Sequence, residues 1–194
     1  MKIILASKSG VRKKILESNK IDCEVIVSNV DEDEVKSSLL SEGADPLSIS
    51  KNLAEIKSIK VSNKFPDRVV LGADSVISLN NELINKPKSR EEALKILKKL
   101  NNSKHFLISS VCISKNGAMV WNYTDTSELK MKNLTESHLL NYLAKIKTET
   151  LCAYGVYQVE AEGLELFEYI KGDLNSIMGL PINEIINYIK QIKK

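Results

Sequence analysis

One carboxylate stands inside an apolar run of the sequence. Residues 69–77 are rich in β-branched and small apolar side chains, as in a buried strand, and only Asp74 and Ser75 interrupt them. Burial of an unpaired charge is so costly that Asp74 must meet a metal ion, a cation or a hydrogen-bond network. Gly72 and Ala73 leave room for a close approach beside it. Asp74 is therefore a candidate functional residue, although an aspartate near a strand end can also simply bind a neighbouring turn.

Lysines near this run could supply the cation. Lys57 falls within the apolar arc of a predicted helix, one turn after Leu53, where a lysine is out of place. Lys60 lies on nearly the same arc, so periodicity does not choose between the two, and either side chain can extend into solvent instead. Lys86 precedes Pro87 in a tight turn that restricts its backbone, although a lysine beside a proline is also common on protein surfaces.

The turn after the first predicted strand has the composition of an anion site. Its sequence is Ser7-Lys8-Ser9-Gly10-Val11-Arg12. Small hydroxyl residues at a helix start let backbone N–H groups face a phosphate, and Arg12 can add a bidentate contact. The turn is neither a Walker A sequence nor a G-x-G-x-x-G motif. An ordinary β-to-α turn with a serine N-cap would have the same residues.

An acidic run, residues 31–34, follows the second predicted strand and is expected on a loop, where such a run is usually solvated. A loop carboxylate facing Asp74 would instead form a divalent-metal site of the Mg²⁺ type. The two histidines are too few for a multi-histidine zinc centre, and no serine has a visible base partner for a Ser-His-Asp hydrolase. Acids, lysines and the serine turn together suit a polyphosphate, whose oxygens cations neutralise while a carboxylate takes a proton from attacking water.

The composition indicates one globular unit. A chain of 194 residues, 43% hydrophobic and 27% charged, can form one sizeable core or two small lobes around a cleft. A net charge of +3 and 5% aromatic residues make nucleic acid an unlikely partner. Three cysteines without metal spacing are expected as reduced core thiols. The first apolar stretch is too short for a signal peptide and no run has transmembrane length, so we expect a cytoplasmic location and no membrane partner.

Strands and helices that would position the candidate residues alternate early in the chain. Strands are expected at residues 3–6, 23–27, 69–77, 82–84, 105–114 and 118–131, the last two joined by a hairpin at Asn116-Gly117. Helices are expected after Gly10, after Asp45 to about residue 63, after Ser89 to about residue 100, after Thr135 to about residue 147, and from Pro181 onward. This order predicts an α/β fold with a mixed, twisted sheet flanked by helices.

In this setting the chain resembles the Maf (septum-formation) proteins, a family of nucleoside triphosphate pyrophosphatases. The resemblance runs nearly end to end, and six short motifs in the same order make it specific. The motifs are Leu5-Ala6-Ser7-Lys8-Ser9 with Arg12, Asp31-Glu32, Leu53-Ala54-Glu55-Ile56-Lys57, Gly72-Ala73-Asp74-Ser75-Val76, Asn85-Lys86-Pro87, and Gly172-Asp173 with Gly179-Leu180-Pro181.

The resemblance implies a single Maf/ITPase-like domain over residues 1–194, with two lobes around a central cleft, often homodimeric and dependent on Mg²⁺ or Mn²⁺. It implies that water cleaves a nucleotide between its α- and β-phosphates, giving the monophosphate and pyrophosphate. It also favours Lys57 over Lys60 as the lysine that extends into the cleft. By matching position it implies roles for six residues: Asp74 as general base or metal-organising acid, Glu32 as metal ligand, Lys57, Lys86 and Arg12 as phosphate contacts, and Ser7 in the phosphate turn.

Three departures from the family pattern concern which nucleobase the substrate carries. Val11 stands where many members have the first of two arginines, and Ser75 stands where they have threonine. Glu160 lies opposite a glutamine of the pyrimidine-preferring group, and a carboxylate only accepts hydrogen bonds. Glu160 with Val11 resembles the branch that acts on 7-methyl-GTP, because a carboxylate can accept from the guanine N1–H and amine and attract the charge of the methylated base. Alternatively, Gln158 takes the role of the family glutamine.

A hypothesis from another class is a nucleotide-sensing regulator of division. Such a protein would bind the same ligand without turning it over, since Gly10 and Val11 alter the phosphate turn. Nucleic-acid binding ranks third, because the sequence has no basic stripe with interleaved aromatic residues.

Overall fold

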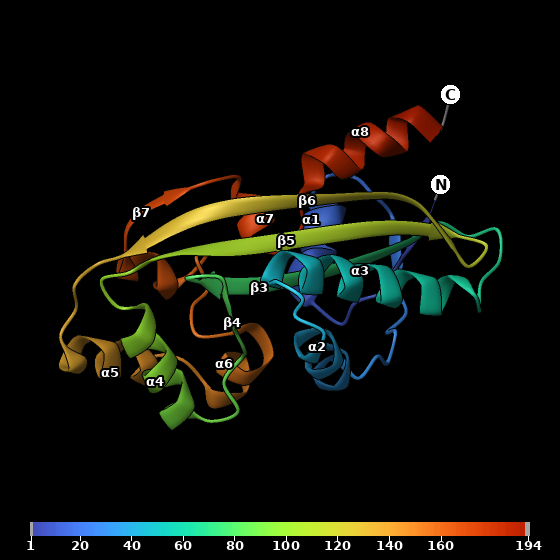
Figure 1. Ribbon diagram of the computed structural model, residues 1–194. Helices are drawn as coiled ribbons and strands as arrows, with labels where there is room; N and C mark the ends of the chain where they lie inside the picture. Colours follow the sequence, from blue (N-terminus) through green and yellow to red (C-terminus); the bar gives the residue numbers. More distant parts are fainter. Residues whose placement is uncertain (1, 193–194) are drawn as a thin grey trace.

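A mixed sheet organises the chain in the computed structural model, which describes residues 2–192 (Figure 1). In this range seven strands form one sheet in the order β2-β1-β3-β5-β6-β7, and β4 pairs with β3. β1 is parallel to β2 and β3, and the other pairs are antiparallel. The strands are β1 Ile3–Leu5, β2 Cys23–Val25, β3 Val70–Leu79, β4 Glu82–Ile84, β5 Lys104–Lys115, β6 Ala118–Met131 and β7 Phe167–Lys171. The predicted α/β class with a mixed sheet is confirmed.

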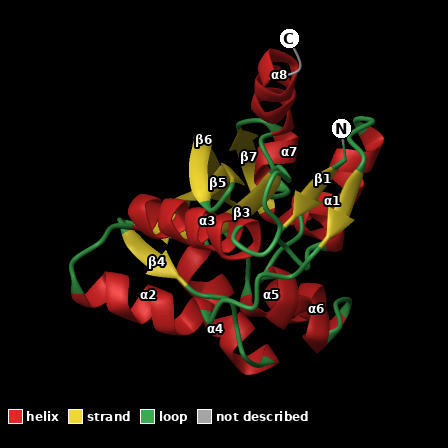
Figure 2. Ribbon diagram, turned by 90° about the vertical axis from the view of Figure 1, so that its right-hand side faces the viewer, coloured by secondary structure: helices red, strands yellow, loops and turns green. Residues whose placement is uncertain are grey.

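Helices connect and flank these strands. They are α1 Gly10–Ser18, α2 Glu32–Ser41, α3 Pro46–Ser62, α4 Arg90–Leu100, α5 Glu136–Ala144, α6 Thr148–Tyr154, α7 Leu174–Ile177, α8 Ile182–Ile192 and the 3-10 helix η1 Glu162–Leu166. The predicted caps are present, because the side chains of Asp45, Ser89 and Thr135 accept hydrogen bonds from the third residue after each. Figure 2 shows the same elements from the side, with α8 on the opposite side of the sheet from α4, α5 and α6.

The prediction of a loop for residues 31–34 is wrong. Asp31 is the N-cap of α2 and accepts from the backbone N–H of Glu34, and the acids that follow lie in the first helical turn. Carboxylates are favoured there because they face the positive end of the helix dipole. The helix predicted to reach residue 147 ends at Ala144. The sequence patterns also gave no indication of α6, α7 and β7.

The two faces of the sheet carry different helices. Along β5, Ser110 contacts Ser50 of α3 at 2.9 Å between Oγ atoms, whereas the neighbouring Ser109 donates to the carbonyl of Ser176 in α7 at 2.7 Å. Because successive strand side chains point to opposite faces, α3 and α7 cover opposite faces of β5. The close approach expected at Gly72 is that of α3, since a Cβ on Gly72 would lie 2.8 Å from the backbone nitrogen of Ser58.

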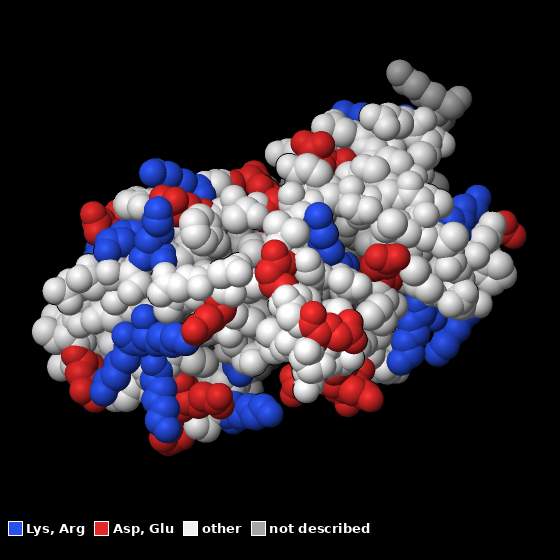
Figure 3. Space-filling model, in the orientation of Figure 1, with Lys and Arg blue, Asp and Glu red and all other residues white. Residues whose placement is uncertain are grey.

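Buried hydrophobic side chains form two main clusters. The larger joins β5, β6 and β7 to α4, α5 and α6, and the smaller joins β1 and β3 to α1 and α8. Cys23 and Cys112 are buried free thiols, and Cys152 is a half-buried one. None of the helices in the described range combines the length and apolar character that a bilayer crossing requires. On the face drawn in Figure 3, basic and acidic side chains are interspersed.

Candidate active site

The candidate site lies at a break in the edge of the sheet. β1 pairs with β3 as far as Leu71, and β4 pairs with β3 only from Ile77. Between these points β3, including Asp74, has β5 on one side and, within residues 2–192, no strand on the other. Peptide groups at an open edge need other partners. The break therefore leaves space where side chains and a ligand can reach β3.

A cleft of about 400 Å³ opens at this break. The predicted site residues all line it: Ser7, Val11, Arg12, Glu32, Lys57, Asp74, Ser75, Lys86 and Glu160. They come from the β1–α1 turn, α1, α2, α3, β3, the segment after β4 and the segment after α6. The fold thus brings together residues that are more than a hundred positions apart in the sequence.

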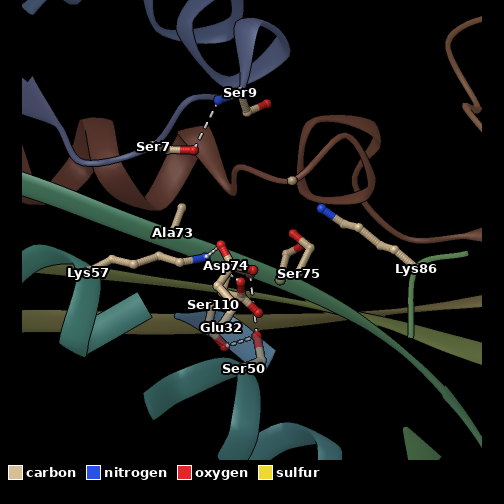
Figure 4. A network of polar contacts seen from close by, with 12 residues as sticks. Ser7, Ser9, Glu32, Ser50, Lys57, Ala73, Asp74, Ser75, Lys86 and Ser110 are labelled. Atoms are coloured by element: carbon tan, nitrogen blue, oxygen red, sulfur yellow. Dashed lines mark hydrogen bonds and ion pairs between the residues drawn. The ribbon is translucent and has the colours of Figure 1, made fainter. Parts of the chain in front are cut away.

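Three charged residues form the centre of the site (Figure 4). The Lys57 ammonium lies 2.7 Å from Oδ1 of Asp74 and 2.8 Å from Oε1 of Glu32. Lys57 and Asp74 are each 5% exposed, so each needs the other's charge. Lys60 instead donates to the carbonyl of Asn29 from an exposed position. The ambiguity that helical periodicity left between the two lysines is resolved in favour of Lys57.

Glu32 is held as a carboxylate by nearby lysines. Burial alone would raise the pKa of its carboxyl, but the charge and hydrogen bond of Lys57, together with the charges of Lys86 and Lys36, lower the pKa below its ordinary value. Glu32 therefore stays a carboxylate, with its side chain 35% exposed at the cleft.

One oxygen at the centre has no partner. Oδ2 of Asp74 is buried and makes no hydrogen bond to the described residues, while Oδ1 is bound to Lys57. A buried acceptor without a partner is uncommon and costly, and it can be relieved by a proton, a water molecule or a cation. Asp74 thus combines a fixed orientation with a free oxygen.

The two carboxylates at the centre are ligands of the kind that a divalent metal takes. Within residues 2–192 no group of three or more His, Cys, Asp or Glu side chains could hold an ion. Asp74 and Glu32 nevertheless converge on one ammonium, so the two carboxylates lie close together. Mg²⁺ is usually bound through one or two carboxylates, with phosphate oxygens and water completing its shell. The pair therefore fits a metal ion that shares its ligands with a phosphate substrate, and does not fit a site made by the protein alone.

Lys86 approaches Asp74 from the side opposite Lys57 (Figure 4). Its ammonium donates to the carbonyl of Ala153 at 2.8 Å. Loss of water around the ammonium, together with repulsion from the Arg12 guanidinium, lowers the pKa of Lys86 below its ordinary value. Because desolvation and a neighbouring positive charge both disfavour the Lys86 ammonium, an anion bound beside it would be stabilised.

The serine turn serves as both cap and cleft wall. Ser9 caps α1 by accepting from the backbone N–H of Arg12, as the ordinary-turn interpretation requires, and Ser7 accepts from the backbone N–H of Ser9. The Arg12 side chain donates to Ser7 and to acceptors in β3 and near α7. The turn therefore has the predicted N-cap and also faces the cleft, so the two interpretations are compatible.

Residues 153–160 form another wall of the cleft. Glu160 is exposed on this wall, and the amide of Gln158 donates to the carbonyl of Gly155 at 3.0 Å. From behind, the hydroxyl of Tyr142 donates to the Val156 carbonyl. Glu160 is thus free to meet a ligand, whereas the Gln158 amide is engaged within its own segment.

Lys8 and Lys36 also line the cleft and were missed as candidates from the sequence. Lys36 lies one helical turn after Glu32, so it would have been found had α2 been predicted. Lys8 stands between two serines that were singled out, and only the fold shows that it faces the cleft.

Comparisons with known proteins show which family the chain is similar to. A family model described as Maf-like protein matches residues 2–192. A nucleoside triphosphate pyrophosphatase of Pelagibacter ubique is 60% identical over 191 residues, covering 98% of each chain. A 7-methyl-GTP pyrophosphatase of Rhizobium etli is 34% identical over 191 residues, covering 98% of this chain and 96% of that one. A solved HAM1 protein from Coxiella burnetii is 15% identical with a TM-score of 0.45, over 69% of this chain and 74% of that chain.

Proposed function

Since the chain belongs to the Maf family, we propose that it is a nucleoside triphosphate pyrophosphatase. The observation that carries the proposal is the buried Asp74, held by Lys57 at 2.7 Å with one oxygen free, in a cleft whose other walls carry cations. The relative named for this activity is 60% identical over nearly the full length of both chains. The reaction is hydrolysis of the α–β phosphoanhydride, giving a nucleoside monophosphate and pyrophosphate.

In the proposed mechanism Asp74 is the general base. Lys57 holds Oδ1, so Oδ2 takes a proton from a water molecule. The oxygen of that water forms a bond to the α-phosphorus. The bond from this phosphorus to the bridging oxygen breaks, and pyrophosphate leaves with the electron pair. Asp74 then gives the proton to solvent or to the departing product.

The phosphates are bound by lysines that have no carboxylate partner. Lys57 is already paired with two acids, so its charge is largely used within the protein. Lys86, Lys36 and Lys8 line the same cleft without an ion pair among the described residues. We assign to them the β- and γ-phosphates, whose charge they neutralise as pyrophosphate forms.

Glu32 and Asp74 are the residues that would hold a divalent cation, Mg²⁺ or Mn²⁺, together with oxygens of the substrate. When bound, such an ion would withdraw charge from the phosphates and polarise phosphorus. This assignment is supported by the proximity of the two carboxylates, because Lys57 pairs with only one oxygen of each, Oδ1 of Asp74 and Oε1 of Glu32.

For the nucleobase of the substrate, we propose guanine with or without a 7-methyl group. The support is the exposed Glu160 on the cleft wall, whose carboxylate can accept from guanine N1–H and the exocyclic amine. The positive charge of a 7-methylated guanine would strengthen the contact. A relative named 7-methyl-GTP pyrophosphatase is 34% identical. The relative that is 60% identical is named nucleoside triphosphate pyrophosphatase, without a stated nucleobase.

The test is a panel of canonical and 7-methylated triphosphates incubated with the purified protein and Mg²⁺ or Mn²⁺. We expect pyrophosphate and the monophosphate in equal amounts, with guanine nucleotides preferred. Tight nucleotide binding without product would favour the nucleotide-sensing regulator instead. Release of single phosphates would contradict cleavage between the α- and β-phosphates.

A further inference from the structure

We propose that Arg12 is a positioning residue that bridges the break in the sheet edge beside Asp74, and that it does not act as a phosphate ligand. The proposal rests on the proposed function, because it concerns how that site is held in shape. It differs from the phosphate contact that the family resemblance implies for Arg12.

The first observation is that the guanidinium is already occupied. Nε donates to the carbonyl of Gly179 at 2.9 Å, and Nη2 donates to the Ser75 hydroxyl at 3.1 Å. Nη1 donates to the Ser7 hydroxyl at 3.2 Å and to the Ala73 carbonyl at 2.9 Å. A guanidinium has five N–H donors, so these contacts leave one of them. A bidentate phosphate contact needs two parallel donors, and protein bonds would have to break to provide them.

The second observation is where the Ala73 carbonyl lies. Two residues earlier, the Leu71 carbonyl accepts from the backbone N–H of Ala6, at the end of the β1 pairing. Alternate carbonyls of a strand point to the same edge, so the Ala73 carbonyl points into the break. Arg12 gives this carbonyl the donor that a neighbouring strand would have supplied. The contact is made at the residue directly before Asp74.

The third observation is that the contacts join three separate segments. Arg12 begins in the first helix, reaches β3 at Ala73 and Ser75, and binds the turn that follows α7 at Gly179. From Ser75 the network continues to the Ser109 hydroxyl at 2.9 Å. These segments form three walls of the cleft. Arg12 therefore fixes the distance between the serine turn, the Asp74 strand and the turn after α7.

Gly179 fits this arrangement closely. Its φ of +103° is disfavoured for residues with a side chain, and a Cβ there would lie 3.2 Å from Arg12 Nε and 3.2 Å from the Ser75 hydroxyl. A lysine at position 12 could not replace the arginine, because a single ammonium cannot reach acceptors on three segments in the fixed planar geometry of a guanidinium.

The test compares Arg12→Gln with Lys86→Gln, since both remove one positive charge from the cleft and leave an amide. Dissociation constants for inorganic pyrophosphate are measured by calorimetry, and kcat and KM by pyrophosphate release. We expect Lys86→Gln to weaken pyrophosphate binding about tenfold or more. Arg12→Gln should change it by less than about threefold while lowering kcat at least tenfold with KM nearly unchanged. Arg12→Lys should show the same loss of kcat as Arg12→Gln.

A double-mutant cycle of melting temperatures tests the role of Arg12 without measuring activity. Because Arg12 and Ser75 are bonded, the melting-temperature shift of the double variant Arg12→Gln/Ser75→Ala should be smaller than the sum of the single shifts. If Arg12→Gln does not fold, Gly179→Ala takes its place in the kinetic comparison. The proposal is overturned if the shifts add, or if Arg12→Gln weakens pyrophosphate binding as much as Lys86→Gln and Arg12→Lys restores it. A wild-type protein that releases no pyrophosphate would contradict the proposed function, and the cycle would still decide the role of Arg12.

Discussion

The lysine at the centre of the cleft determines what its two acidic neighbours can do. With Nζ between Asp74 and Glu32, both acids lie near positive charge, and only Asp74 keeps a buried oxygen free. Asp74 could be singled out from sequence because a carboxylate in an apolar run is conspicuous. Lys57 could not be chosen over Lys60 from periodicity, because two residues three apart share a helix face. Only the tertiary fold places its ammonium at the acid.

Replacement of Asp74 by asparagine should separate binding from chemistry. We expect Asp74→Asn to lower kcat by about 10²- to 10⁴-fold, the usual contribution of a general base. Binding of a triphosphate with a methylene group between the α- and β-phosphates should persist. Asp45→Asn is the matched control, since Asp45 lies outside the cleft and asparagine caps a helix as well as aspartate does. Full activity of Asp74→Asn would exclude Asp74 as the base.

Glu160 is expected to govern base preference. Glu160→Gln should lower kcat/KM for 7-methyl-GTP relative to UTP by about tenfold or more, because a hydrogen bond to a charged group is lost. The ratio of the two kcat/KM values, measured for wild type and variant, is the readout. Glu162→Gln, an exposed neighbour that does not line the main cleft, should leave the ratio unchanged. An unchanged ratio in Glu160→Gln would point to another residue of the wall.

At the scale of elements, the site depends on how closely α3 lies on β3. Gly72 in β3 allows the backbone of α3 to approach. Lys57 lies on α3 and Asp74 on β3, so the pair is carried by these two elements. Elements with strong local signals, such as the capped helices α3 and α4 and the β5–β6 hairpin, could be predicted from sequence. Helix α2 has no buried residue, so it lacks the apolar stripe on which prediction depends. Strand β7 pairs with the end of β6 far along the chain, which local patterns do not reveal.

A methyl group at Gly72 should disturb this contact. Gly72→Ala would place a Cβ 2.8 Å from the Ser58 nitrogen and in conflict with the Ala54 carbonyl, so α3 must move. We expect a loss of about 1–3 kcal/mol in the free energy of unfolding by urea, typical of overpacking, together with lower activity as Lys57 shifts. Gly10→Ala is the stability control, because a Cβ there would meet no atom of residues 2–192 within 4 Å. Equal stability of the two variants would show that the contact is not tight.

The whole molecule builds the cleft from segments that no local pattern connects. The β1–α1 turn, α2, α3, β3 and residues 153–160 meet only because the sheet edge is broken between β1 and β4. The family motifs indicated which residues belong together, but not how they contact one another. The break itself, and the use of Arg12 within it, could not be inferred from sequence because both depend on strand register.

A pH-sensitive group lies against Tyr157 and Phe167 of the larger hydrophobic cluster. His105 is fully buried, with Nε2 at 3.0 Å from the Tyr157 hydroxyl, and burial lowers its pKa to about 4 from 6.5. Between these pH values the unfolded chain binds a proton that the folded protein does not, so stability falls as pH falls. We expect a loss of roughly 2 kcal/mol between pH 7 and pH 5 from this group.

Urea unfolding at the two pH values measures this effect. His105→Gln should remove most of this pH dependence, whatever its overall stability, because glutamine does not titrate. His138→Gln, at an exposed position in α5, serves as the control and should keep the wild-type dependence. Equal dependence in wild type and His105→Gln would mean that His105 is not the responsible group.

The most direct test of the central claim is hydrolysis in ¹⁸O-labelled water, with the products analysed by mass spectrometry. Attack at the α-phosphorus, next to Asp74, predicts one labelled oxygen in the nucleoside monophosphate and none in the pyrophosphate. Label in pyrophosphate or in free phosphate, with an unlabelled monophosphate, would contradict the proposed reaction.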